Sequence, residues 1–171
     1  MRYCPEPEET VQDHDEAEKN EETVHLSLFN SDQRNRKLTT LLEESDGYAV
    51  LDTGCSATVC GVGWLERYIG GLSDYQRSKL VEEMSDASFT FGTGAAVTSL
   101  KKIKLPCQLG ALSADITTDV VDCEIPLLLS KRSMKKVKMC LDFEKDSVKF
   151  QDEHINLKSS ASGHYLLPLS F

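Results

Sequence analysis

Asp52 is the residue of this chain best suited to chemistry, because an apolar run leads directly into it. In the stretch GYAVLDTGCSATVCG, residues 48–51 are suited to a buried strand, and Thr53 and Gly54 then turn the chain. The strand fixes the aspartate, the threonine hydroxyl can hydrogen-bond neighbouring backbone, and glycine lets a second chain approach closely. The pattern favours a presented carboxylate, although a plain turn between two buried strands can have the same three residues.

A single carboxylate is insufficient for hydrolysis of a peptide bond without a metal or a covalent intermediate. The reaction needs a base that activates water and an acid that protonates the carbonyl oxygen and then the leaving amine. Two aspartates in contact supply both functions by sharing one proton. The sequence has no second Asp-Thr-Gly or Asp-Ser-Gly, so any second carboxylate of this kind has to come from elsewhere.

The six cysteines and the basic clusters offer less chemistry than Asp52. Cys55 and Cys60 are separated by four residues, but no second pair of Cys or His stands at a spacing that completes a tetrahedral zinc site. Nothing else suggests secretion, so we expect reduced thiols, no metal and no cofactor. Basic residues cluster at 101–104 and 131–138, where we expect a solvated face rather than a nucleic-acid site.

Three helices are predicted after the Asp52 motif. Residues 62–72 place apolar side chains at helical spacing and end beside a Gly-Gly pair. Ser73 begins a Ser-x-x-Gln capping box for a second helix that continues to Met84 with an apolar stripe at Leu80, Val81 and Met84. Ser130 is expected to cap a third helix over residues 131–138.

Strands are predicted for most of the remaining chain. Residues 88–100 alternate around a Gly-rich tip, which indicates a hairpin. Strand-like stretches follow, with breaks expected at Pro106, Gly110 and Pro126, and IPLLL at 125–129 is typical of a buried strand. Residues 139–150 predict two strands around a turn, so β elements outnumber helices.

Taken together, the motif and its surroundings resemble one protein family. AVLDTGCSATVCG resembles the active-site loop of the retroviral-type aspartic proteases, the retropepsins of retrovirus and retrotransposon polyproteins. FTFGTGAAVTS lies where that family has its Gly-tipped flap, and IPLLLSKRSMKKVKMCLDF is similar to the strand, helix and strand that close its core. The resemblance covers residues 46–150 and implies a mainly β fold, a closed β-barrel-like single lobe with a few short helices.

The resemblance also implies roles for two groups of residues. Asp52 is similar to the catalytic aspartate, Thr53 to the residue that hydrogen-bonds across the dimer beneath the aspartates, and Gly54 to the loop glycine. The flap tip, which closes over an extended polypeptide substrate, is implied for Gly92, Thr93 and Gly94.

A homodimer follows from the resemblance, because a chain with one such motif donates one Asp52 to a site on a two-fold axis. The apolar segments HYLLPLSF, at 164–171, or VHLSLF, at 24–29, could supply strands between the subunits. We therefore expect an aspartic endopeptidase that cleaves extended polypeptides. The alternative is a domesticated or catalytically decayed domain that dimerises or binds peptides without turnover.

Two departures from the family pattern motivate that alternative. The chain has Ser130-Lys131-Arg132 where the family commonly has Gly-Arg-Asp or Gly-Arg-Asn. The helices predicted between residues 62 and 86 also lengthen the interval between the active-site loop and the flap, as an insertion on the surface would.

Charge separates the chain into two parts. Residues 1–24 contain nine acidic and two basic residues, a net charge of −7 out of −9 for the whole chain, which leaves −2 for the remainder. Such a segment predicts an acidic disordered tail, followed by a retropepsin-like domain over residues 25–171. We expect no membrane partner and an intracellular, cytoplasmic location, because no apolar run reaches membrane-spanning length and the start is not a secretory signal.

Overall fold

The fold is given by a computed structural model that describes residues 41–91 and 94–170. The predicted acidic tail, the segment VHLSLF and the flap-tip residues Gly92 and Thr93 lie outside these residues. The division into a tail and a domain that begins at residue 25 therefore stays a prediction.

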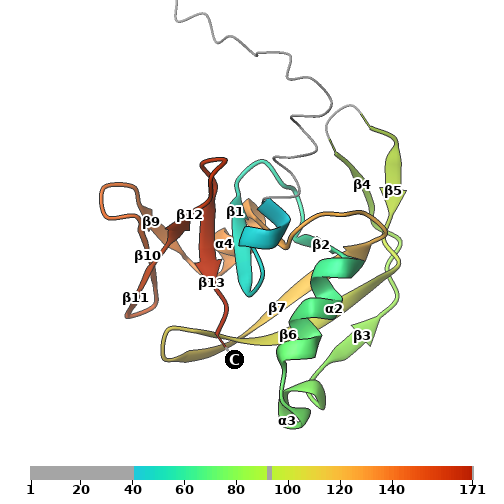
Figure 1. The fold of residues 1–171 in the computed structure, drawn as a ribbon, viewed down its shortest axis with the longest axis horizontal. Helices are drawn as coiled ribbons and strands as arrows, with labels where there is room; N and C mark the ends of the chain where they lie inside the picture. Colours follow the sequence, from blue (N-terminus) through green and yellow to red (C-terminus); the bar gives the residue numbers. More distant parts are fainter. Residues whose placement is uncertain (1–40, 92–93, 171) are drawn as a thin grey trace, which may run out of the picture.

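One sheet of eight strands dominates the described structure (Figure 1). In spatial order its strands are β12 (Lys158–Ser159), β13 (Tyr165–Pro168), β1 (Tyr48–Asp52), β8 (Leu128–Ser130), β2 (Val59–Gly61), β7 (Leu112–Val121), β6 (Lys101–Leu109) and β3 (Val81–Glu83). The prediction of a mainly β single lobe is confirmed. Its closure into a barrel is not, because β12 and β3 are unconnected ends of an open sheet.

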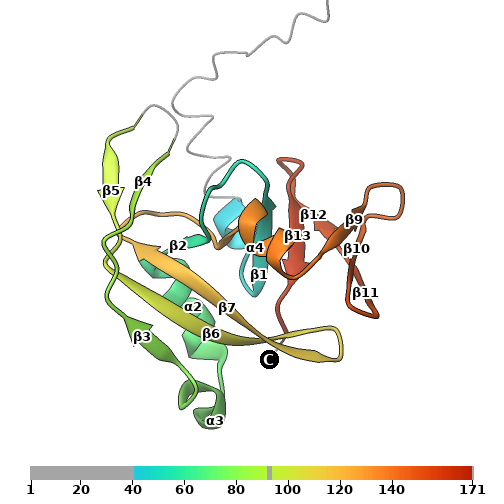
Figure 2. The same cartoon turned by 180° about the vertical axis from the view of Figure 1, so that it is seen from behind.

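Two smaller sheets extend the lobe at opposite ends, as Figures 1 and 2 show from either side. The first consists of β11 (Glu153–Asn156), β10 (Ser147–Phe150) and β9 (Cys140–Asp142). The second is the predicted hairpin of β4 (Ser88–Thr90) and β5 (Ala96–Thr98), with Phe89 opposite Val97.

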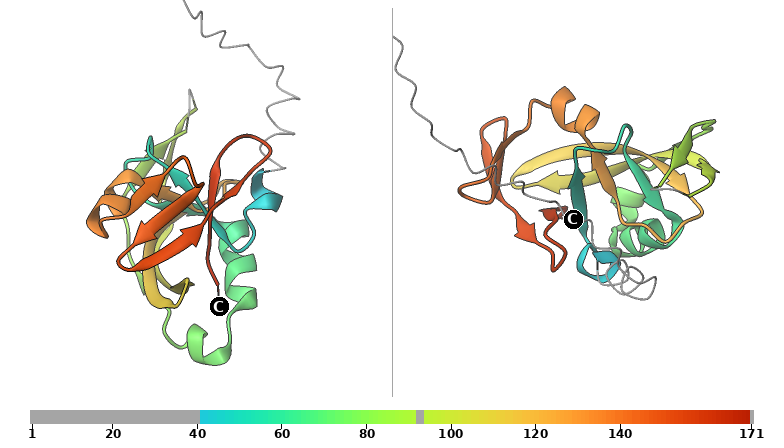
Figure 3. Two further views of the ribbon diagram at one scale, coloured as in Figure 1. Left: turned by 90° about the vertical axis from the view of Figure 1, so that its left-hand side faces the viewer. Right: turned by 90° about the horizontal axis from the view of Figure 1, so that it is seen from above.

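Short helices flank the large sheet. They are α2 (Val62–Gly71), α3 (Asp74–Arg77) and α4 (Lys131–Lys136), and residues 41–44 are also helical. The 41–44 turn and α4 lie on opposite sides of β1 (Figure 3). None of the helices in the described part of the chain is long and apolar enough to cross a membrane.

The helix α2 forms where the apolar spacing predicts it, and it carries the largest side chains of the core. Trp64 and Tyr68 are buried and stack with ring centroids 4.9 Å apart. Each also satisfies its polar atom, since Trp64 Nε1 donates to the carbonyl of Ser45 at 3.1 Å and the Tyr68 hydroxyl donates to the carbonyl of Pro106 at 2.8 Å. These contacts tie α2 to the segment before β1 and to β6.

The second helix is shorter than predicted. The Ser73–Gln76 capping box is present, but α3 ends at Arg77, and Val81–Glu83 form the strand β3 instead. The expected inward stripe is wrong, because Met84 is fully exposed and Val81 is 48% exposed. Pairing of β3 with the edge of β6 satisfies the backbone of this segment and overrides its helical spacing.

Pro106 does not break the chain as predicted. It lies inside β6, opposite Asp115 of β7, and the strand continues to Leu109. Proline is accepted there because β3 pairs only with residues 102–104, so the missing N–H of Pro106 faces no partner strand. The predicted break at Gly110 is correct, since that residue has a φ of +62° in the β6–β7 turn.

The C-terminal strand serves this chain rather than a second copy. Strand β13 lies between β12 and β1, with Ala49 opposite Leu167. Its main-chain groups are used on both edges, so the proposed role of HYLLPLSF as an intersubunit strand does not fit this structure. The alternative segment for that role, VHLSLF, lies outside the described residues.

Candidate active site

Asp52 ends β1, which lies inside the large sheet with partners on both sides. β1 pairs antiparallel with β13 and parallel with β8, where Asp52 stands opposite Ser130. Val50, two residues earlier, is buried, and Asp52 itself is half-buried. A strand anchored on both edges fixes the position from which the carboxylate emerges, as the sequence pattern predicts.

The carboxylate of Asp52 is oriented by its own turn. Its Oδ1 atom accepts hydrogen bonds from the N–H groups of Gly54 at 2.8 Å and Cys55 at 3.2 Å. Within the described residues, Oδ2 accepts none. A Cβ on Gly54 would lie 3.2 Å from Oδ1, which is tighter than ordinary contact, so glycine at this position keeps the carboxylate in place. The turn therefore fixes Oδ1 of Asp52, whereas Oδ2 remains available to exchange a proton.

A cluster of three hydroxyl groups holds the far end of the loop. Thr58 Oγ1 lies 3.1 Å from Ser130 Oγ and 2.7 Å from Ser133 Oγ. The N–H of Ser130 also donates to Thr58 Oγ1 at 3.2 Å. Ser130 is the predicted helix cap, and its Oγ accepts from the N–H of Ser133 at 3.3 Å. The cluster fastens the Asp52 loop to β8 and α4, at the corner where the sequence departs from the family pattern.

Sequence reasoning missed Thr58 and Ser133 as parts of this site. Thr58 is buried although polar, and Ser133 lies three residues after the helix cap. The sequence gives only local indications of these two residues, namely the Ser-x-x-Ser start of α4 and the threonine in SATVCG. Their meeting across 75 residues follows from the antiparallel pairing of β2 with β8, where Val59 lies opposite Leu128, and the sequence does not encode this pairing locally.

Gly61 allows the loop to pack closely as it leaves the site. Its N–H donates to the carbonyl of Ile125 at 3.1 Å. A Cβ at this position would lie 2.0 Å from the carbonyl oxygen of Cys123, which no side chain can do without moving the backbone. The second glycine of the quoted motif is therefore required by a close approach of two chain segments.

A groove separates the Asp52 loop from the β4–β5 hairpin. Its volume is about 330 Å³, and Asp52 is the only carboxylate among the described residues that line it. Phe89 and Phe91 line it from the hairpin, with their rings stacked at 6.2 Å between centroids. An extended segment with apolar side chains suits such a groove. Of the predicted flap tip, only Gly94 is described, and its N–H donates to the carbonyl of Phe91 at 3.1 Å.

Thr53 is exposed on the outer side of the loop, and so is Gly54. The structure brings Asp52, Thr53 and Gly54 together in one turn, as the sequence requires of consecutive residues. The role implied for Thr53 in a dimer stays a prediction.

Cys55 lies beside the carboxylate and is half-buried. Its Sγ lies 2.8 Å from the carbonyl oxygen of Ala57, to which the thiol donates. Burial, with a smaller contribution from the charge of Asp52, raises the pKa of the Cys55 thiol, while its hydrogen bond to Ala57 opposes the rise. The thiol is therefore less ionised than an exposed one and is a poor nucleophile near neutral pH.

The other cysteines do not contribute to the site. Cys60, Cys107, Cys123 and Cys140 are free thiols in the structure, and burial raises the pKa of Cys60 and of Cys107 to about 12. Across residues 41–91 and 94–170, no three His, Cys, Asp or Glu side chains are grouped so that they could hold a metal ion.

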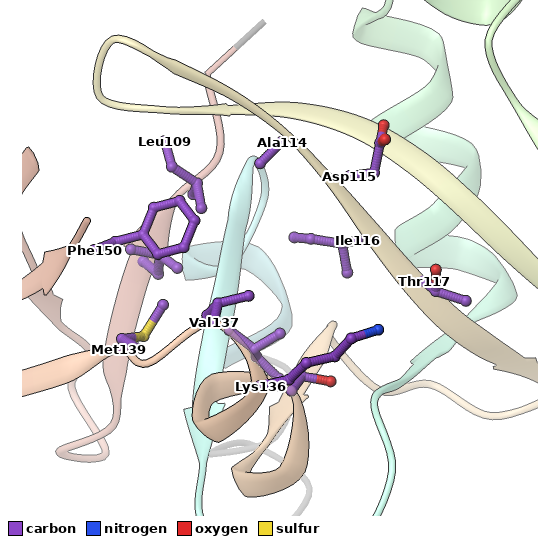
Figure 4. Close-up of a pocket in the computed structure, with 12 residues that line it drawn as sticks. Leu109, Ala114, Asp115, Ile116, Thr117, Lys136, Val137, Met139 and Phe150 are labelled. Carbon is purple, nitrogen blue, oxygen red and sulfur yellow. The ribbon is translucent and has the colours of Figure 1, made fainter. Parts of the chain in front are cut away.

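A separate apolar cavity of about 180 Å³ lies between α4 and the β6–β7 hairpin. Figure 4 shows Ile116, Val137, Met139 and Phe150 around it. Ser133 lines this cavity and also belongs to the hydroxyl cluster, so one side of α4 faces the cavity while its start holds the Asp52 loop. Asp52 is not among its lining residues.

Comparisons with known proteins find similar solved structures but no match in sequence. No protein-family model matches the chain, and no curated protein matches it. Among solved structures, the chain matches the retroviral protease-like domain of Ddi1 from Leishmania major, with 12% sequence identity and a TM-score of 0.41. The match covers 66% of this chain and 93% of that domain.

Proposed function

We propose that this chain is an aspartic endopeptidase of the retroelement type that acts as a homodimer on extended polypeptides. The observation that carries the proposal is the position of Asp52 as the one carboxylate in the groove between its loop and the β4–β5 hairpin. The held Oδ1 and the unbonded Oδ2 suit a group that must keep its orientation while it exchanges a proton.

The second carboxylate of the reaction is the Asp52 of a second copy. One ionised Asp52 removes a proton from water as the water oxygen attacks the carbonyl carbon of the substrate. The other, protonated, Asp52 gives its proton to the carbonyl oxygen, which forms a tetrahedral diol. As this diol collapses, one of its hydroxyl groups returns a proton to the ionised carboxylate and the C–N bond breaks, while the protonated carboxyl gives its proton to the leaving amine. Neither a metal nor a covalent intermediate takes part.

The hairpin would bind the substrate by its backbone. Strands β4 and β5 form a sheet of two strands, and each pairs with no strand other than its partner. An extended peptide can add to such an edge through main-chain hydrogen bonds, and its side chains then enter pockets on alternate sides. Phe89 and Phe91 favour apolar side chains next to the cleaved bond.

A matched pair of substitutions tests the proposal. Asp142 also ends a strand, and its Oδ1 accepts from the N–H groups of Glu144 at 3.0 Å and Lys145 at 3.1 Å, so it has the same turn geometry as Asp52. Asp52→Asn should abolish cleavage of an unfolded protein between pH 4 and 7, because an amide cannot act as acid or base. Asp142→Asn should leave the rate unchanged. Undiminished cleavage by Asp52→Asn would refute the proposal.

A peptide-binding module without turnover is the second candidate. The observation that favours it is the shared geometry of Asp52 and Asp142, because an aspartate that only closes a turn makes the same hydrogen bonds. Sedimentation at several concentrations shows whether two Asp52 carboxylates can meet, because a strict monomer cannot assemble the pair, and a cleavage assay then separates the two candidates. A dimer that binds an unfolded protein but shows no cleavage at any pH from 4 to 7 would identify the module.

A further inference from the structure

The two basic clusters of the chain differ in whether their charges have partners. On β6, each lysine faces a carboxylate: Lys101 lies 2.6 Å from Glu82, Lys104 lies 2.8 Å from Asp115, and Lys102 lies 3.9 Å from the nearly buried Asp119. The lysines of this cluster remain partly exposed, as expected of a solvated face, and the fold supplies their counter-charges.

On α4 the charges have no such partners. Within residues 41–91 and 94–170, none of Lys131, Arg132 and Lys135 takes part in an ion pair. Together with residues 53–56 they line a hollow of about 340 Å³, here called the α4 hollow, and none of the described residues that line it is acidic. Three cations around one hollow repel one another, so an anionic occupant would be stabilised.

We propose that the acidic segment of this same chain, residues 6–22, docks in the α4 hollow. This segment holds nine carboxylates and one basic residue, Lys19, whereas the chain from residue 25 onward has a net charge of only −2. Most of the net negative charge of the chain therefore lies in a segment that is covalently attached to the domain containing the hollow. Attachment raises the effective concentration of the segment above that of a free acidic peptide.

The length of the chain permits this contact. Eighteen residues separate residue 22 from residue 41, where the described structure begins. Fully extended, they span about 60 Å, whereas a domain of this size is on the order of 35–40 Å across. The segment can reach α4 although the 41–44 turn lies on the other side of β1 (Figure 3).

The α4 hollow lies beside the Asp52 loop. Gly54, Cys55 and Ser56 line both the α4 hollow and the groove that contains Asp52. The proposed contact at Lys131, Arg132 and Lys135 is therefore next to the Asp52 loop. It rests on charge alone, so the docking does not depend on the proposed function.

Zero-length carbodiimide cross-linking of the full chain at low salt tests the contact directly. We expect amide links between acids of residues 6–22 and Lys131 or Lys135, mapped by mass spectrometry, and the loss of these links in 0.5 M NaCl. The close pairs Lys101–Glu82 and Lys104–Asp115 are internal positive controls. The mass of the product shows whether the segment comes from the same chain or from a second copy. Links within one chain support the proposal, whereas links found only between two copies overturn it.

Trypsin cleavage after Lys19 provides a second, quantitative measurement. In the full chain, the triple variant Lys131→Gln, Arg132→Gln, Lys135→Gln should be cleaved there at least about fivefold faster than the unchanged protein, because docking protects the segment. The control removes the same charge from lysines remote from the hollow: Lys145→Gln, Lys149→Gln, Lys158→Gln. It should be cleaved at the unchanged rate.

Three further results would overturn the proposal. The first is formation of the Lys101–Glu82 link without any link from residues 6–22 to α4. The second is equal cleavage after Lys19 in all three proteins. The third is cross-linking of added polyglutamate to Lys131 while the chain's own segment stays unlinked, which would assign the hollow to an acidic peptide from another molecule.

Discussion

Two turns of this molecule place an aspartate in nearly the same way. Asp52 ends β1 and Asp142 ends β9, and in each the Oδ1 atom accepts from the N–H groups two and three residues later. The N–O distances are 2.8 and 3.2 Å in the first turn and 3.0 and 3.1 Å in the second. The hydrogen-bond pattern is therefore that of an ordinary aspartate turn, and by itself it does not identify a catalytic residue.

The two turns differ in the strands, side chains and open space that surround them. β1 lies between two strands of the large sheet, and its loop is fastened by the Thr58 cluster and faces a groove. β9 is an edge strand of a three-stranded sheet, and Lys145 lies 3.8 Å from the Asp142 carboxylate. The Asp52 turn therefore differs from the Asp142 turn in two ways. Paired strands and a hydroxyl cluster hold it in position, and a groove lies next to its carboxylate.

Gly54→Ala is the substitution for which we expect the largest difference between the Asp52 turn and the Asp142 turn. The equivalent position of the other turn is Glu144, which already carries a Cβ, whereas a Cβ on Gly54 meets Oδ1 of Asp52 at 3.2 Å. The carboxylate has to move by a few tenths of an ångström or more. A misplacement of about 1 Å at a reacting group costs ~10²-fold in rate, and a smaller displacement costs less. We expect the kcat/KM for peptide cleavage to fall by about tenfold and by no more than ~10²-fold.

Glu144→Ala is the control for this prediction and should leave kcat/KM unchanged. Thermal unfolding of both variants separates displacement of the carboxylate from loss of the fold. Full activity in Gly54→Ala would show that the orientation of Asp52 by its own turn is not needed for catalysis.

Thr58→Val tests the support that only the Asp52 turn has. The substitution keeps the shape of the side chain but removes the oxygen that bonds to Ser130 and Ser133, and it leaves the buried N–H of Ser130 without an acceptor. An unpaired buried polar group costs about 1–3 kcal/mol. We expect the free energy of unfolding to fall by that amount in a urea titration.

The matched control is Thr117→Val, which makes the same change at an exposed position of β7. Surface substitutions of this kind are usually within about 0.5 kcal/mol of the unchanged protein. Equal unfolding free energies for the two variants would mean that the hydroxyl cluster does not fasten the loop.

The sequence predicted those features that depend on neighbours along the chain. The α2 spacing, the Ser73 capping box, the Ser130 cap and the β4–β5 hairpin all follow from local patterns, and all are present. The Asp52 turn belongs to this group, since its hydrogen bonds span only two and three residues.

Features that depend on pairing across the chain were missed or wrong. Val81–Glu83 has the spacing of a helix but is a strand because β6 offers it an edge. Pro106 is tolerated because it lies between the residues that pair with β3, 102–104, and the bridge from Gln108 to Ser170. The partners of Thr58 lie more than 70 residues away. Neither propensity nor spacing contains this information, because it arises only when the strands are placed side by side.

Two cysteines allow the turns to be compared without measuring activity. Cys55 is the third residue after Asp52 and is half-buried, whereas Cys140 lies two residues before Asp142 and is exposed. Burial and, secondarily, the Asp52 charge raise the pKa of Cys55. Because the thiolate is the reactive species, an aromatic disulfide reagent at pH 8 should label Cys55 about tenfold more slowly than Cys140.

The same measurement shows how much of this protection comes from Asp52. Asp52→Asn removes the negative charge, so the pKa of Cys55 should move down and its labelling should become faster, but only in part, because burial is the larger cause. Asp142→Asn should leave labelling of Cys55 unchanged. If Asp52→Asn left the Cys55 rate as it was, the carboxylate would be too far from the thiol, or too well solvated, to act on it, and the difference between the two turns would rest on packing alone.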